Sequence, residues 1–104
     1  MASVPRSSPR VFNVVEVECH TLDETATPVA ARMSDLSLTG AFLDSMAGLR
    51  LGTRLSLRFK VGEQDVQATA EVVHQMPQFG MGVRFLELSA EGHAAIERLL
   101  KEQG

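Results

Sequence analysis

Two short polar clusters carry the residue types in this chain that could do chemistry. The first is Arg6-Ser7-Ser8-Pro9-Arg10, and the second is Asp35-Leu36-Ser37-Leu38-Thr39-Gly40. A guanidinium presents a planar fork of donors that suits phosphate oxygens and the edge of guanine. The second cluster adds short acceptors and donors, followed by a glycine at which the backbone can turn or let a ligand come close. Together the two clusters predict a clamp for a small anion.

The segment that carries the two arginines, residues 1–10, is expected to be a flexible strap. Arg6 and Arg10 have the spacing of one helix face, but Pro9 opposes a helix there. No acidic residue precedes Glu16, so the arginines make a locally positive arm on an acidic chain. Such an arm attracts a small anion without attracting a nucleic-acid duplex.

The second cluster favours an extended strand through residues 35–39. Side chains alternate between the two faces of a strand, so Asp35, Ser37 and Thr39 would share one side. We expect this polar side to form the site. Asp35 could accept hydrogen bonds from the N1 and N2 donors of guanine or from an arginine, and Ser37 could both donate and accept.

In these two motifs, RxxxR and DxSxxG, the chain resembles the PilZ domain family. The resemblance extends from the first motif to the end of the chain and includes the stretch Gly80–Phe85, which is similar to a late glycine-valine strand of the family. It implies a small six-stranded antiparallel β-barrel with a C-terminal helix, and a bacterial receptor domain for cyclic di-GMP. It also implies the ligand-binding residues, which are Arg6, Arg10, Asp35, Ser37 and Gly40.

The chain departs from the family pattern at one position beside the first motif. The family often has another basic residue just before its first motif arginine, where this chain has Pro5. Variation there is associated with whether one or two stacked nucleotides are held. The sequence therefore leaves the number of bound nucleotides open.

The elements expected to position these residues are short strands followed by one helix. The clearest period-two pattern runs through Leu55, Leu57, Phe59 and Val61. Further strands are expected over residues 11–20, 29–38, 41–43, 66–72 and 82–86, with hairpin connections at 62–65 and 76–80. A helix over about 89–103 would begin at Ser89 as N-cap. The pattern predicts an all-β fold with a C-terminal helix, in which residues 11–104 form a single domain.

Composition excludes several classes of function. The chain has 104 residues, 44% of them hydrophobic and 22% charged, which is typical of one globular domain. A net charge of -3 and only five aromatic residues, all phenylalanine, oppose DNA or RNA binding. No apolar run approaches the roughly 20 residues that span a bilayer, so we expect no membrane insertion.

A single cysteine permits no internal disulfide, which favours the cytoplasm. We expect a monomer or a weak dimer.

Other charged and metal-ligating residues are weaker candidates. Arg54, Arg58 and Lys60 form a basic stripe that is more typical of a solvated strand face than of a partner surface. Arg32 and Arg84 could add positive charge if their strands flank the site, but the sequence does not place them. Cys19 is expected to be a small buried side chain, and the three histidines share no metal-binding spacing with it. The histidines are His20, His74 and His93.

We therefore expect a ligand-sensing module without catalysis, cofactor or metal. By the family resemblance, cyclic di-GMP would order the strap and change the affinity for an unidentified protein partner that governs motility, exopolysaccharide output or development. The alternative is an interaction module of the same fold that binds no nucleotide. A serine hydrolase is disfavoured because the sequence has no glycine-serine elbow, and a phosphodiesterase would need metal ligands that the sequence does not supply.

Overall fold

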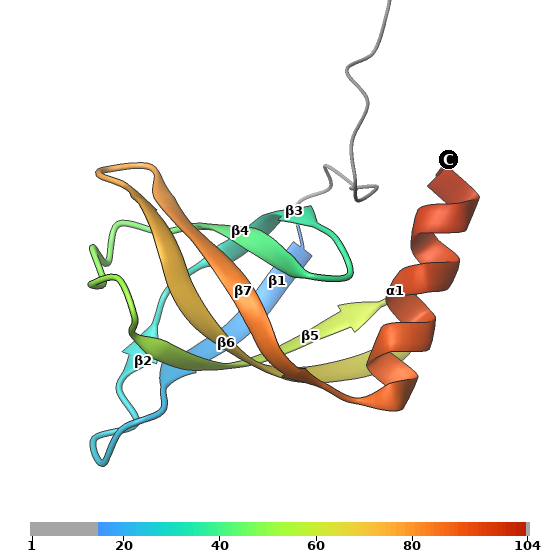
Figure 1. The fold of residues 1–104 in the computed structure, drawn as a ribbon, viewed down its shortest axis with the longest axis horizontal. Helices are drawn as coiled ribbons and strands as arrows, with labels where there is room; N and C mark the ends of the chain where they lie inside the picture. The colour runs from blue at the N-terminus through green and yellow to red at the C-terminus, as the bar shows by residue number, and fades with distance from the viewer. Residues whose placement is uncertain (1–14, 104) are drawn as a thin grey trace, which may run out of the picture.

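The computed structural model describes residues 15–103, which form a closed barrel of antiparallel strands and one helix (Figure 1). The elements are β1 (Val15–Thr21), β2 (Pro28–Val29), β3 (Arg32–Leu36), β4 (Gly40–Asp44), β5 (Arg54–Val61), β6 (Gln64–Met76), β7 (Gly80–Leu88) and α1 (Ala90–Gln103). The expected strap, with Arg6 and Arg10, lies outside the described residues, as does the beginning of the strand expected from residue 11. The division into a strap and one domain therefore stays a prediction.

The barrel closes because β1 pairs with strands from both ends of the sheet. The hydrogen-bonded order is β1-β3-β4-β7-β6-β5, and β5 returns to β1 with Val17 opposite Phe59 and Thr21 opposite Leu55. All of these pairings are antiparallel. The prediction of a six-stranded antiparallel barrel with a C-terminal helix is confirmed.

The strand expected over residues 29–38 is divided in the structure. β2 and β3 lie along the same edge of β1, where Cys19 stands opposite Val29 and Val15 stands opposite Met33. The chain leaves the sheet between them, at residues 30 and 31. A sequence pattern reports which residues are extended, but not where a partner strand is available, so the break was not predicted.

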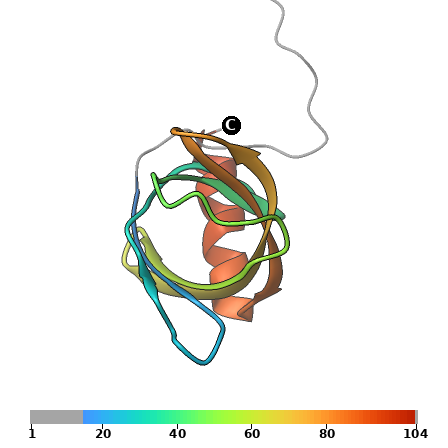
Figure 2. The same cartoon turned by 90° about the vertical axis from the view of Figure 1, so that its left-hand side faces the viewer.

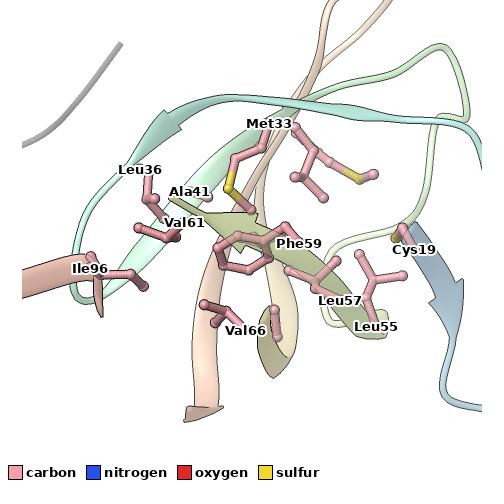
Figure 3. Close-up of a cluster of buried hydrophobic side chains, with 14 of the residues drawn as sticks. Cys19, Met33, Leu36, Ala41, Leu55, Leu57, Phe59, Val61, Val66 and Ile96 are labelled. Atoms are coloured by element: carbon pink, nitrogen blue, oxygen red, sulfur yellow. The ribbon is translucent and has the colours of Figure 1, made fainter. Parts of the chain in front are cut away.

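Alternating side chains of the strands fill the barrel. β5 follows the predicted pattern, and its inward residues are no more than 8% exposed: Leu55, Leu57, Phe59 and Val61. Figure 3 shows Phe59 in the middle of this cluster, and its ring stacks on Phe85 with centroids 6.5 Å apart. Each fully buried large apolar side chain contributes about 1.5–3 kcal/mol. The interior is thus a packed core, and ligand chemistry must take place on the outside.

The helix α1 covers one opening of the barrel. In Figure 2, which looks along the barrel, α1 crosses behind the ring of strands. The Ser89 hydroxyl accepts a hydrogen bond from the Gly92 amide at 3.0 Å, which confirms Ser89 as the N-cap. Ala95, Ile96 and Leu100 are buried in the core, and Ile96 lies at the same end of the cluster as Leu36 (Figure 3). The residues of the second motif therefore lie at the helix end of the barrel.

Candidate functional site

The second motif forms the connection between β3 and β4, and its structure differs from the predicted strand. β3 ends at Leu36 and β4 begins at Gly40, so residues 37–39 form a turn. The Ser37 amide donates to the Gly40 carbonyl at 2.9 Å and closes the turn. The prediction that Asp35, Ser37 and Thr39 share one face of a continuous strand is therefore wrong.

The side chain of Ser37 is directed into this turn. It is 1% exposed, and its hydroxyl lies within hydrogen-bond distance of the Thr39 amide at 3.2 Å and of the Gly40 amide and carbonyl, each at 3.3 Å. Buried backbone groups need such partners, because leaving one unpaired costs about 1–3 kcal/mol. Ser37 thus fixes the shape of the turn that carries the motif.

Gly40 is one of two points at which β4 and β7 approach each other too closely for a side chain. A Cβ atom built on Gly40 would overlap the carbonyl oxygen of Val83 and would lie 3.2 Å from the Cα of Arg84. No side chain fits there without moving one of the two strands. Gly40 consequently contributes no side chain to the surface at this point.

Asp35 lies at the end of β3, on the other side of β4 from β7. It stands opposite Phe42 after a bulge between Met33 and Asp35, and its side chain is half-buried. The bulge adds a residue to β3 and changes the direction in which Asp35 points. The structure thus brings Asp35, Ser37 and Gly40 together at one corner of the barrel.

The described chain begins close to this corner. Val15 stands opposite Met33, which is only two residues before Asp35. Arg10 is five residues before Val15, and an extended segment of that length reaches about 17 Å, whereas Met33 and Asp35 are about 7 Å apart along the strand. Neither motif arginine belongs to the described residues, so an approach of Arg10 to Asp35 stays a prediction.

Strand register places a row of charged residues beside Gly40 that the sequence did not reveal. Gly40 stands opposite Arg84 on β7, Arg84 stands opposite Glu71 on β6, and Glu71 stands opposite Arg54 on β5. The guanidinium of Arg84 lies 3.5 Å from the Glu71 carboxylate. The sequence suggested Arg84 as a possible added charge but did not place it, and it did not reveal Glu71 as a neighbour. Only the pairing of strands distant in sequence brings these residues together.

The other candidate cations do not stand opposite Gly40. Arg58 on β5 stands between Glu18 and Gln67, and Lys60 stands opposite Asp65, so polar or acidic neighbours accompany the exposed basic stripe. This arrangement favours the solvated-face interpretation. Arg32 stands opposite Asp44, at the end of β4 away from Gly40.

The buried cysteine and the histidines offer no second site. Cys19 is buried as predicted, and burial raises the pKa of its thiol to about 11. Within residues 15–103, no three His, Cys, Asp or Glu side chains gather as metal ligands would. Across the same residues, no helix has the length and apolar character needed to cross a bilayer.

Comparison with known proteins gives one family and one fold. The family model described as PilZ domain matches residues 5–102. The structure of the Bacillus subtilis inhibitor of motility (MotI/DgrA) superposes with a TM-score of 0.75 at 16% identity, over 97% of this chain and 52% of that chain. Among curated proteins, no match was found.

Two solved PilZ domains share the fold over most of their length. The PilZ domain of CeSA from a cellulose-synthesizing bacterium has a TM-score of 0.67 at 18% identity, over 90% of this chain and 96% of that one. The PilZ domain of YcgR from Escherichia coli, solved with c-di-GMP, has a TM-score of 0.64 at 19% identity, over 93% of this chain and 89% of that one. The chain spans about half of the Bacillus subtilis protein, 52%, and nearly all of these two domains.

Proposed function

The chain belongs to the PilZ domain family, and on that premise we propose that it is a receptor for cyclic di-GMP with no catalytic activity. The observation that carries the proposal is the corner at which Ser37 and Gly40 hold the motif turn beside the point where the N-terminal segment enters the barrel. Both motifs of the family are complete in the sequence. A PilZ domain of the same fold was solved with this nucleotide.

The proposed roles follow from the chemistry of the ligand. Cyclic di-GMP carries two phosphodiester charges and two guanine bases. Arg6 and Arg10 supply guanidiniums for phosphate oxygens and for the O6 and N7 edge of guanine. Asp35 accepts from the N1 and N2 donors of the base, while Ser37 holds the turn and Gly40 keeps the surface free of a side chain.

We propose further that the nucleotide acts as a switch. Binding would order residues 1–10 against the barrel and alter a surface that a protein partner recognises. The partner would govern motility, exopolysaccharide output or development, and the first of these agrees with the name of the Bacillus subtilis neighbour, an inhibitor of motility. The single free cysteine suits a reducing cytoplasm.

The test is a calorimetric titration of the wild type and variants with cyclic di-GMP. Arg10→Ala and Asp35→Ala should each weaken binding roughly tenfold to a hundredfold, because each removes a hydrogen bond to a charged group. Arg58→Ala is the matched control, since it removes an exposed arginine from the far strand β5. If the wild type gives no heat of binding at high micromolar cyclic di-GMP, the proposed receptor function is rejected.

One observation favours the alternative, an interaction module that binds no nucleotide. Large apolar side chains are exposed in the connections at the other end of the barrel from α1, and among them Met46 is 83% and Phe79 69% exposed. The two connections adjoin, since the Ser45 amide donates to the Phe79 carbonyl. A titration without heat would leave this surface as the functional one.

A further inference from the structure

The arginine that stands opposite the motif glycine has a position suited to ligand binding. Arg84 and Asp35 flank β4 on its two sides, since Arg84 pairs with Gly40 and Asp35 pairs with Phe42. Two strand spacings and two residue rises separate them by about 12 Å along the sheet. A base held at Asp35 can therefore extend its phosphate toward Arg84.

Between Arg84 and Asp35, the surface lacks a side chain at Gly40. Gly40 contributes no side chain to it, and Ala41 is buried on the inner side of β4. The Phe42 ring leans over β7 at Gly80, where its Cε2 atom lies 2.8 Å from the position a Cβ would take. Gly80 pairs with Asp44, at the opposite end of β4 from Gly40, so the ring leans away from Arg84. At Gly40 itself, β4 offers a ligand only main chain.

Arg84 is held loosely enough to change its partner. Its side chain is 61% exposed, and its distance to the Glu71 carboxylate, 3.5 Å, exceeds the 2.7–2.9 Å of a strong charge-assisted hydrogen bond. An exposed pair of this kind contributes little to stability. Glu71 also faces Arg54 on its other side, so its charge keeps a basic neighbour when Arg84 turns away.

We propose that Arg84 is a third cationic contact for the ligand phosphate and that Glu71 competes for it in the free protein. On binding, the guanidinium leaves the carboxylate and donates to phosphate oxygens above Gly40. The proposal rests on the proposed function, since it needs an anionic nucleotide at the motif. It adds a ligand-binding residue from β7 to those of the strap and the motif turn.

Titrations of three variants with cyclic di-GMP test the proposal. Arg84→Gln should weaken binding roughly tenfold to a hundredfold. Glu71→Gln should tighten binding by a few-fold, because it removes both the competing partner and a negative charge near the phosphate. Arg58→Gln, which removes another exposed arginine, on β5, should leave the dissociation constant unchanged.

The salt dependence of the dissociation constant separates direct phosphate binding from a structural effect. Removing a cation that binds phosphate should reduce the slope of log Kd against log salt concentration, so Arg84→Gln should show a smaller slope than the wild type. Wild-type affinity and slope in Arg84→Gln would overturn the proposal while leaving the receptor intact. Weakening by Glu71→Gln equal to that of Arg84→Gln would also overturn it, because the ion pair itself would then be what matters. If the wild type does not bind cyclic di-GMP, both the proposed function and this inference are rejected.

Discussion

At the scale of single residues, Ser37 shows how a motif position can shape its own turn with a side chain that is directed away from solvent. Its hydroxyl satisfies amides of its own turn and is shielded from water at 1% exposure. A buried turn needs such an internal acceptor for its amides. Asp35, by contrast, is only half-buried, and its proposed role in binding a guanine base needs that exposure.

We predict that Ser37→Ala destabilises the protein by about 1–3 kcal/mol, because buried backbone groups lose their partner. Urea unfolding followed by circular dichroism measures the change. Ser34→Ala is the matched control, since the Ser34 hydroxyl donates to Asp44 in an exposed pair and water can replace it. Equal stability losses in the two variants would contradict the role assigned to Ser37.

At the scale of elements, the docking of α1 on the sheet depends on a glycine that helix propensity disfavours. Gly92 is buried in the first turns of α1, where a Cβ would lie 2.7 Å from Cγ1 of Val66 on β6 and 2.9 Å from the capping hydroxyl of Ser89. The missing side chain lets the helix approach β6 and keep its N-cap. The helix end of the barrel, where the motif turn lies, is closed in this way.

The sign of the stability change in Gly92→Ala distinguishes an effect of helix propensity from an effect of packing. Propensity alone predicts a gain of about 1 kcal/mol for alanine in a helix. Overpacking against Val66 predicts a loss of about 1–3 kcal/mol, and we expect the loss to prevail. Thermal unfolding should therefore show a lower melting temperature for the variant. A raised melting temperature would mean that α1 has room to shift.

At the scale of the whole molecule, Cys19 reports on the closure of the barrel. It lies on β1 between Leu57 of β5 and Val29 of β2, so its burial depends on β1 staying paired with these neighbours. Burial raises the pKa of this thiol from 9.0 to about 11. The folded state consequently keeps a proton that the unfolded chain releases above pH 9.

This difference predicts that the free energy of unfolding falls as pH rises from about 9 to about 11, and that the thiol has no such effect at neutral pH. Denaturant unfolding of the wild type and Cys19→Ala at pH 7.5 and pH 10.5 measures it. The wild type should lose more stability than the variant over this interval, while lysine titration affects both alike. Parallel losses would show that the thiol is not buried in the folded state.

Much of the fold and part of the site were predictable from local patterns. The alternation along β5, the N-cap at Ser89 and the apolar spacing in α1 each report which side of an element is buried, and the structure confirms all three. Such patterns depend on residues close in the chain, because side-chain period and capping are local properties. The motif residues Asp35, Ser37 and Gly40 were identifiable for the same reason, as a short spacing.

Only the tertiary structure decided how these residues are used. Four features depend on the register between strands that are distant in sequence. They are the turn at Ser37, the close approach of β7 to Gly40, the return of β5 to β1, and the row that joins Gly40 to Arg84 and Glu71. A strand pattern fixes which face is apolar but leaves the partner and its register undetermined, because those follow from packing of the whole barrel. The sequence by itself determined the kind of barrel and its motif, and the folded chain determined which neighbours that motif has.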